Sequence, residues 1–432
     1  MDFHNLISLT GIPALLAVAW LLSRDRRRMN WRVIGFGVGF QLLLGAVVFR
    51  APGSRAVFGW LNDAVLSLLT AAQAGQKFLF GPLADAAAMD KAFGAGRGFV
   101  LVIQALPVIV FFAALMALLY HWRVMTGIVR GFAWLFTRVM RISGAESLCA
   151  ASNIFVGIES TTTVRPFLRR MTRSEMCTIL TAGMATVASS TLAVYVGFLK
   201  DTFEGIAGHL ISASILSAPA AIVCSKVLLP EDGEPVTLGR SVRPQVEPAA
   251  SAIDAVIGGA MAGVRLVVGI CALLIAFLGM VALVDLGLGE VGRWFGMDGE
   301  AGATLSLSWL LGYVFRPVAA AIGVPWSDAR LAGEMLGTRL VATEIPAYLH
   351  LADAMKAGAF SHPRSAVVTA YALCGFAHVA SLAIFVGGTA ALVPERRSDL
   401  AAVGPRALLA ATLACLMTGA VAGTFFVAPG GG

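Results

Sequence analysis

Charged residues are scarce in this chain. Of its 432 residues only 13% are Asp, Glu, Lys or Arg, whereas 58% are hydrophobic, and the mean hydropathy is +0.82. Soluble globular domains carry about 25% charged residues, which keep their surfaces wetted. So low a charge content argues against a water-soluble protein, and we expect lipid to be the solvent of most of the chain.

Cysteine and the common catalytic motifs are also sparse. The cysteines stand singly in apolar surroundings, without the spacing of a metal site, and are Cys149, Cys177, Cys224, Cys271, Cys374 and Cys415. The sequence shows no Walker motif, phosphate-binding glycine loop or nucleophile elbow. We therefore expect no organic cofactor and no direct use of ATP, which leaves an ion gradient to drive any transport.

Long hydrophobic runs are what the sequence has in quantity. About eight of them approach the roughly 20 apolar residues that cross a bilayer as a helix. They cover residues 6–22, 33–49, 99–120, 176–199, 210–229, 264–284, 366–393 and 407–427. The first run has no cleavage site followed by a soluble domain, so we expect a retained helix and not a signal peptide.

The basic residues determine the expected topology. The net charge of +7 comes from Arg and Lys in short loops beside apolar runs, which argues against nucleic-acid binding. Arginines cluster at residues 24–32, 123–141, 165–173, 240–243 and 396–406, and such loops face the cytoplasm. This alternation requires both termini to be external and residues 144–167 to enter and leave on the cytoplasmic side, as a re-entrant hairpin. We expect a multi-pass protein of a bacterial inner membrane.

A proline-containing polar loop divides the chain into two related halves. Residues 183–193 (GMATVASSTLA) and 375–383 (GFAHVASLA) match in register at G, A, V, A and S on either side of it. Each copy follows an interrupted segment with an intramembrane glutamate, and the charge pattern makes the two copies inverted, as in alternating-access carriers. We assign N-terminal spans and an external interfacial segment to 1–98, the first core half to 99–229, the loop to 230–248, and the scaffold helices with the second core half to 249–432.

Polar residues inside the expected membrane region are candidates for function. Residues 152–163 (SNIFVGIESTTT) cannot form a lipid-facing helix, because Asn153, Glu159 and several hydroxyls would lack water. Gly157 allows an irregular turn that would place Glu159 at a hairpin tip. The alternatives are hydroxyls that bond to their own helix and a Glu159 paired with an arginine.

The second half offers an equivalent set. Glu344 precedes the helix-breaking Pro346, and its carboxylate could accept two hydrogen bonds from a sugar diol. The alternative for Glu344 is a structural ion pair with Arg339, expected near the membrane surface, or with Arg316. His378 stands where the first half has Thr186, and it can donate, accept or titrate, unless it is simply packed against a backbone carbonyl.

Hydroxyls in the fourth apolar run suggest a cation site. Thr186, Ser189 and Ser190 fall within one turn, where a broken helix would present oxygen ligands and freed carbonyls, with Asn153 expected nearby. Ser and Thr also mediate ordinary helix packing in membranes, so this pattern alone leaves both interpretations open.

A series of short motifs makes the chain resemble the concentrative nucleoside transporters over nearly its whole length. They are residues 75–83 (GQKFLFGPL), 144–147 (GAES), 153–157 (NIFVG), 164–166 (VRP), 171–175 (MTRSE), 312–317 (GYVFRP), 323–326 (GVPW) and 373–377 (LCGFA). The resemblance implies an all-α polytopic membrane protein with eight spans, two opposed re-entrant hairpins, interfacial helices and a homotrimer whose protomers work independently.

The resemblance also implies roles for particular residues. A sodium site would comprise Asn153, Val156, Thr186 and Val187, the valines through their carbonyls. The first hairpin tip, at Gly157, Ile158 and Glu159, would contact the base. Residues that would bind the nucleoside in the second half are Glu344, Phe376, His378 and Ser381, with Glu344 and Ser381 facing the ribose hydroxyls.

Three positions depart from the family pattern. Residues 157–162 (GIESTT) replace the usual run of glycine, glutamine, threonine or serine, glutamate, alanine and proline, and are one residue shorter. Thr343 replaces the asparagine before the ribose-binding glutamate, and His378 replaces an asparagine that contacts ribose. These changes predict an altered base preference.

Four functions are compatible with these observations. The favoured one is a symporter that imports nucleosides with sodium or a proton. The second is a carrier of another polar metabolite on the same scaffold, which the altered hairpin and His378 would explain. A membrane-embedded enzyme using Glu159, Glu344 and His378, or a signalling scaffold, would have to work without translocation.

Overall fold

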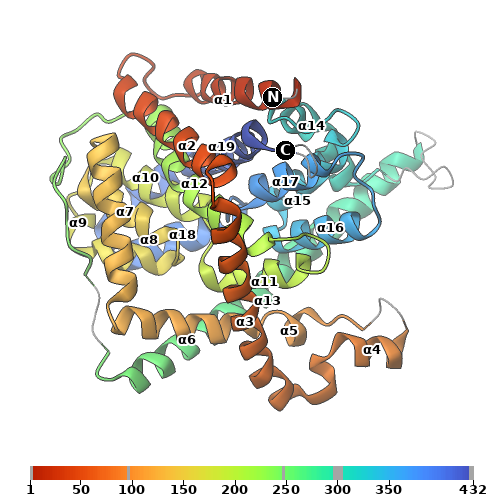
Figure 1. Cartoon of the computed structure of the whole chain (residues 1–432). Coiled ribbons are helices and arrows are strands. Elements are labelled where there is room, and N and C mark those ends of the chain that lie inside the picture. The colour runs from red at the N-terminus through yellow and green to blue at the C-terminus, as the bar shows by residue number, and fades with distance from the viewer. Residues whose placement is uncertain (1–2, 95–97, 246–248, 295–304, 428–432) are drawn as a thin grey trace.

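The chain folds entirely into helices and loops over the residues that a computed structural model describes, which are 3–94, 98–245, 249–294 and 305–427. Figure 1 shows the resulting bundle. Its first half contains α1 (Phe3–Leu21), α2 (Trp31–Arg50), α3 (Ser54–Phe80), η1 (Gly81–Ala84), α4 (Ala86–Phe93), α5 (Leu101–Gln104), α6 (Val108–His121), α7 (Val124–Met140), α8 (Gly144–Asn153), η2 (Ile158–Val164), α9 (Arg165–Leu168), α10 (Arg173–Ala185), α11 (Ser189–Leu199) and α12 (Ile206–Leu228). The second half contains α13 (Ala252–Trp294), α14 (Leu307–Ala321), α15 (Ala329–Val341), α16 (Glu344–Lys356), α17 (Pro363–Leu373), α18 (Val379–Leu392), η3 (Pro394–Arg396) and α19 (Arg397–Phe425).

Long apolar helices account for most of the expected spans. Seven segments among the described residues are long and apolar enough to cross a membrane, and they correspond to every expected span except 366–393. That segment forms two shorter helices, α17 and α18, with a break at residues 374–378. The expected multi-pass organisation is confirmed, whereas the exact number of crossings stays a prediction.

Two broken helices meet at the centre of the molecule. In the first half, α10 ends at Ala185 and α11 begins at Ser189. In the second half, α17 ends at Leu373 and α18 begins at Val379. The breaks touch, because a Cβ added at Gly375 would lie 2.8 Å from Ala185 O and 2.5 Å from Cys415 Sγ. A glycine is required here so that the two helix ends can approach this closely.

A pair of short helical segments precedes each broken helix. In the first half α8 is followed by η2, and in the second half α15 is followed by α16 after a two-residue interruption at residues 342–343. The order of elements is therefore the same in both halves, as the matched sequences suggest. Their arrangement as opposed re-entrant hairpins, and the inversion of the repeat, stay predictions.

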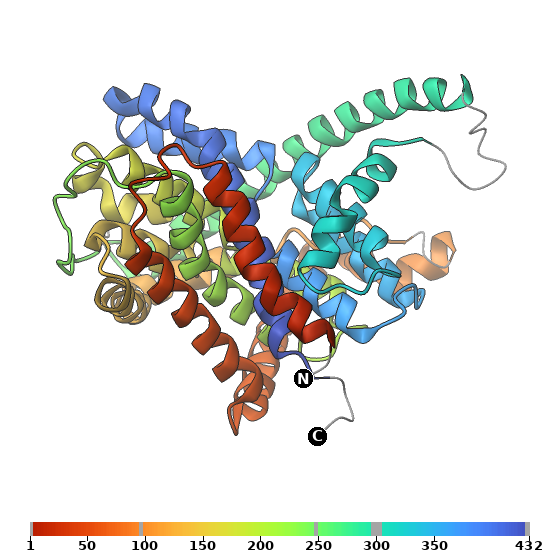
Figure 2. The ribbon, with the colours of Figure 1, turned by 90° about the horizontal axis from the view of Figure 1, so that it is seen from above.

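The arginine-rich loops are joined to one another. Arg24 N donates to Leu228 O, Gly144 N donates to Thr237 O, and the Arg396 guanidinium donates to Arg169 O and Met171 O. The opposite ends of the first and last helices also meet, since Asn5 Nδ2 donates to Phe426 O over 3.1 Å. The two ends of the described chain thus lie on the same side of the bundle, as Figure 2 also shows.

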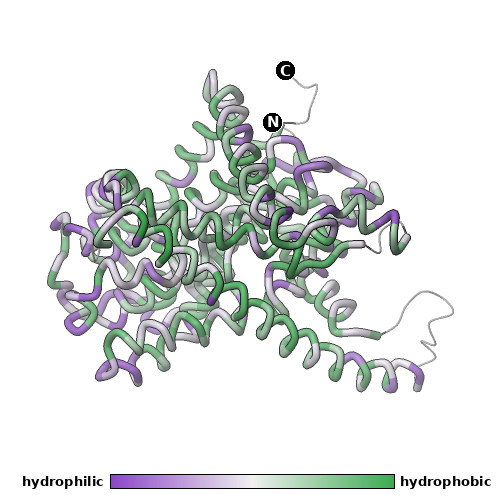
Figure 3. Tube along the Cα trace, turned by 90° about the horizontal axis from the view of Figure 1, so that it is seen from below, coloured by the Kyte–Doolittle hydropathy of each residue, from purple (hydrophilic) through white to green (hydrophobic). Residues whose placement is uncertain are grey.

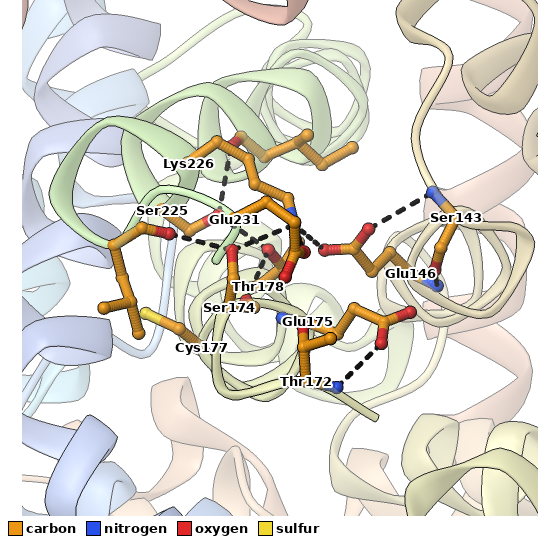
Figure 4. Close-up of polar contacts among 12 residues, drawn as sticks. Ser143, Glu146, Thr172, Ser174, Glu175, Cys177, Thr178, Ser225, Lys226 and Glu231 are labelled. Carbon is orange, nitrogen blue, oxygen red and sulfur yellow. Dashed lines mark hydrogen bonds and ion pairs between the residues drawn. The ribbon is translucent and has the colours of Figure 1, made fainter. Parts of the chain in front are cut away.

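A buried ionic cluster holds the first helix pair against the bundle (Figure 4). Lys226 Nζ, on α12, lies 2.6 Å from Glu146 Oε1 on α8 and 3.0 Å from Glu231 Oε2. The same ammonium donates to Ser174 Oγ on α10 over 3.0 Å. The ammonium of Lys226 therefore holds α8, α10 and α12 together at the side of the arginine-rich loops. Of the two carboxylates that it contacts, Glu146 is buried and Glu231 is partly exposed.

A polar junction at the other side anchors α17. The carboxylate of Asp328 accepts hydrogen bonds from the Ser365 hydroxyl and from the backbone amides of Ser361 and His362. Burial raises the pKa of Asp328, but these hydrogen bonds lower it more, so its pKa lies below the ordinary value. Arg364 reaches the first and last helices, donating to Asn5 Oδ1 and to Gly423 O.

Helix α13 differs from the rest of the bundle. It has 43 residues, against the 21 expected for the span at 264–284, and only 6% of its most apolar window is buried. Figure 2 shows it extending beyond the bundle, and Figure 3 shows hydrophobic residues along most of its length. It packs closely on α6, where Cβ atoms added at Gly259 and Gly263 would lie 2.7 Å from Ala113 O and from Val110 Cα.

Candidate functional site

A cavity of about 280 Å³ lies where the helix breaks and both helix pairs converge. Its walls come from α6, α11, α13 and α18 and from the segments at 155–159, 343–345 and 376–378. The residues expected to bind substrate that line it are Gly157, Glu159, Glu344, Phe376, His378 and Ser381. Ile158 begins η2 beside them, and nothing is described of its side chain.

Glu344 is the most constrained polar group of the cavity. It is 4% exposed and sits at the N-terminus of α16, where helix-end amides favour a negative charge. Oε1 accepts a hydrogen bond of 2.7 Å from the hydroxyl of Tyr195, which stacks on Tyr348 with ring centroids 4.4 Å apart. Oε2 receives no hydrogen bond from any described residue. One carboxylate oxygen is thus fixed by a hydroxyl, and the other keeps a lone pair that a ligand donor could use.

His378 lies beside that second oxygen. The backbone amide of Ser381 donates to His378 Nδ1 over 3.2 Å, so the neutral ring carries its proton on Nε2. Nε2 is 2.9 Å from Glu344 Oε2, close enough for an ion pair but not aligned as a hydrogen bond. The Ser381 hydroxyl has Phe376 O and His378 O as acceptors within reach of its one proton, which fixes the start of α18.

The first helix pair contributes a more open wall. Glu159 is exposed, and it lines both the central cavity and a second cavity of about 1130 Å³ that reaches Arg165 and Arg169. No ion pair of Glu159 is seen among the described residues, so the alternative of an arginine partner has no support there. The two cavities share Tyr120, Val156 and Glu159, which places Glu159 between the central cavity and the side of the arginine-rich loops.

The residues expected to hold sodium either line the cavity or lie within a few residues of its wall in the sequence. Asn153 Oδ1 accepts from Ser160 Oγ over 2.8 Å, and Thr186 Oγ1 donates to Ala182 O over 2.9 Å. Val156 lines the cavity, while Val187 and Thr186 occupy the break between α10 and α11. The donors are an amide, a hydroxyl and carbonyls, which are hard oxygen ligands suited to a small hard cation.

Several polar residues of the site were not singled out from the sequence as site residues. Tyr120 OH and Thr343 Oγ1 are buried without a hydrogen-bond partner among the described residues, and both residues line the cavity. Ser214 Oγ donates to Ile154 O over 3.1 Å and lies 3.5 Å from Val187 O, so it links the end of α8 to the break between α10 and α11 near the expected ion site. Tyr120 stands at the end of an apolar run and Ser214 inside one, which hides both in a hydropathy pattern.

The arginines considered as partners of Glu344 lie elsewhere. Arg316 packs over the ring of Trp326, 4.1 Å from its centroid. The side chain of Arg339 is fully buried within the bundle, and its position near the membrane surface stays a prediction. Its guanidinium donates to Ala372 O instead of pairing with a carboxylate. Glu344 is paired with His378, which the sequence did not suggest.

Comparison with known proteins covers almost the whole chain. Residues 10–83 and 209–423 match the family described as Na⁺ dependent nucleoside transporter, N-terminus and C-terminus, and residues 102–202 match a domain described as nucleoside recognition. The chain is 34% identical to the nucleoside permease NupC of Helicobacter pylori over 98% of its own length and 99% of that protein. The chain belongs to the concentrative nucleoside transporter family.

A further relative and a solved structure agree with this family assignment. The uncharacterized transporter YutK of Bacillus subtilis is 38% identical over 96% of this chain and 98% of that protein. A solved structure of CNTnw in an inward-facing substrate-bound state matches with a TM-score of 0.89 at 35% identity, covering 98% of this chain and all of that one. The family consists of transporters, so the enzyme and scaffold interpretations receive no support.

Proposed function

We propose that this transporter imports nucleosides across a bacterial inner membrane together with a sodium ion or a proton. The observation that carries the proposal is the Glu344 carboxylate, which is buried at the central cavity with Oε1 fixed by Tyr195 and Oε2 facing His378 Nε2 at 2.9 Å. A carboxylate oxygen has two lone pairs, so a ribose hydroxyl could donate to Oε2 beside the imidazole or in its place.

The rest of the cavity suits a heterocycle linked to a sugar. Phe376 offers an aromatic face, and the remaining walls are largely apolar, with a few convergent polar groups. Tyr120 OH and Thr343 Oγ1 add two polar atoms that a base or a sugar could engage. Gly157, Ile158 and Glu159 would contact the base, and His378 and Ser381 the ribose.

The coupling ion would bind at Asn153, Val156, Thr186 and Val187. Because Thr186 and Val187 lie in the break between α10 and α11, next to Ala188 on the cavity wall, an ion there would fix the wall against which substrate binds. Transport would then follow alternating access by two opposed re-entrant hairpins, with external termini and three independent protomers. The family description as sodium-dependent supports sodium over a proton.

A carrier of another polar metabolite is the second candidate. It is favoured by His378, whose imidazole occupies space beside Glu344 Oε2. Displacing or retaining that ring would change which hydroxyls can reach the carboxylate. Uptake that no nucleoside inhibits would support this alternative.

Uptake of labelled uridine and adenosine into vesicles tests the proposal. We expect saturable uptake driven by an imposed sodium or proton gradient, and a loss of about tenfold or more in Glu344→Gln. Glu334→Gln is the matched control, since Glu334 lies on α15 and pairs with Arg330 away from the cavity. Gradient-independent uptake, or equal rates in both variants, would contradict the proposal.

A further inference from the structure

Arg339 is a buried cation that has no counter-ion among the described residues. It lies in the last turn of α15, with none of its surface exposed. No described carboxylate forms an ion pair with it, and its Nε and Nη2 atoms have no oxygen or nitrogen acceptor among the described residues. A charge buried in this way is costly, so something in its surroundings must favour it.

Helix C-termini supply the favourable surroundings. Arg339 Nη1 donates to Ala372 O, in the last turn of α17, and Arg339 itself lies in the last turn of α15. The thiol of Cys415, which lies beside the guanidinium, also contacts Ala185 O at the end of α10. The last carbonyls of a helix lack partners within it and carry partial negative charge. The guanidinium therefore stands where several such ends converge.

The equivalent helix end in the first half of the chain, that of α10, has different surroundings. The side-chain donors that reach the last turn of α10 are the Thr186 hydroxyl, to Ala182 O, and the Cys415 thiol, to Ala185 O, both of them neutral. Thr186 is also one of the residues of the proposed ion site. The end of α10 thus keeps its negative potential for an exchangeable ion, whereas the end of α17 has a charge supplied by the protein.

We propose that Arg339 is a tethered cation that holds the broken helix of the second half, in the role that the coupling ion has in the first half. The inference rests on the proposed ion site in the first half. Arg339 is a positioning residue, because it touches neither the cavity nor the substrate but fixes α17, which leads into Phe376 and His378. Its positive charge, and not its hydrogen bond alone, keeps that end of the cavity in place.

Two substitutions separate charge from hydrogen bonding. Arg339→Lys keeps the charge and one or more donors, whereas Arg339→Gln keeps donors and removes the charge. We expect gradient-driven nucleoside uptake to survive largely in the lysine variant and to fall by about tenfold or more in the glutamine variant. Arg330→Gln is the matched control, because Arg330 is exposed on the same helix and pairs only with Glu334. Equal uptake by the lysine and glutamine variants would overturn the inference.

Chemical rescue gives a second readout that a simple packing role would not move. Arg339→Ala leaves a space of about the size of a guanidinium ion, and guanidinium chloride well below denaturing concentrations should restore thermal stability and uptake to this variant but not to the Arg330 control. Failure of guanidinium to restore either property in Arg339→Ala would also overturn the inference.

Thermal unfolding tests the inference about Arg339 independently of the proposed function. Unfolding midpoints of the purified variants in detergent do not depend on substrate identity, so the order lysine above glutamine, with rescue of alanine, would support Arg339 even if wild-type protein took up no nucleoside. Normal wild-type uptake with lysine and glutamine variants of equal stability and activity would reject the inference alone.

Discussion

Glu344 has different neighbours at its two oxygens, and that difference sets the chemistry of the cavity. Tyr195 fixes Oε1, while His378 stands near Oε2 without donating an aligned hydrogen bond. A ligand hydroxyl at Oε2 would compete with the imidazole for the same space. We therefore expect the residue at position 378 to control how freely a sugar reaches the carboxylate.

Replacing His378 by asparagine should strengthen nucleoside binding. The shorter side chain removes the ring from Glu344 Oε2 and can still donate a hydrogen bond, so we expect KM for uridine or adenosine to fall by about threefold to tenfold. Initial uptake rates over a range of substrate concentrations measure this. His350→Asn, on α16 outside the cavity, is the control, and a higher KM in His378→Asn would show that the imidazole itself binds the substrate.

Lys226 is the residue on which the buried ionic cluster depends. Lys226→Met leaves Glu146 charged and unpaired in a site where its side chain is 1% exposed, and we expect a loss of about 3–5 kcal/mol in stability. Thermal unfolding in detergent should show a large drop in the midpoint. The double variant Lys226→Met/Glu146→Gln should recover much of it. Arg293→Met, which breaks an exposed pair with Glu290, should have almost no effect.

At the scale of elements, small residues set the distance between α6 and α13, which together form one wall of the cavity. Gly259 and Gly263 repeat at the four-residue spacing that lets membrane helices approach closely. Neither position has room for a Cβ without a shift of α6. The width of the cavity on this side therefore depends on the lack of a side chain at Gly259 and at Gly263.

Gly263→Val should push α13 from α6 and lower uptake by about tenfold, because overpacking shifts the backbones that line the cavity. Gly279→Val is the matched control on the same helix, since a Cβ at Gly279 meets nothing within 4 Å. Uptake and surface expression should be measured together. Equal uptake by the two variants would mean that this wall does not shape the substrate site.

Hydropathy and charge predicted most of the elements but not how their ends are held. The run at 366–393 reads as one span, yet it is broken beside Gly375, where close contacts with Ala185 and Cys415 leave no room for a side chain. The burial of Arg339 depends on Ala372, a backbone carbonyl that a sequence pattern does not display. Glu344 and His378 were predicted as site residues, but their pairing depends on a fold that joins α16 to α18.

At the scale of the whole molecule, the bundle has two chemically distinct sides. Contacts among the arginine-rich loops define one, and the junction of Asn5 with Phe426 defines the other. The loop before α17 belongs to the second side, because His362 N bonds to Asp328 and the His362 ring lies 6.2 Å from that of His4. Positive charge near short loops predicts that the first side is cytoplasmic.

Thiol labelling of single-cysteine substitutions tests this orientation. A membrane-impermeant maleimide should label Ala357→Cys in intact spheroplasts and Arg27→Cys only after permeabilisation. Both positions are exposed, and the wild-type protein controls for its own cysteines, which are buried except for the half-buried Cys271. Labelling of Arg27→Cys from outside would reverse the predicted topology.

The length of α13 has a consequence for the lipid around it. Its 43 residues span about 65 Å, roughly twice the hydrocarbon thickness of about 30 Å. Hydrophobic side chains are exposed from Ile253 to Trp294, so an upright helix would leave many of them in water. We expect α13 to lie obliquely, at a much larger angle to the bilayer normal than the usual 20° or so. Because α13 forms one wall of the central cavity, a change in its tilt would change the shape of that wall. We expect the tilt to follow membrane thickness, so the acyl-chain length of the surrounding lipids should affect the transport rate.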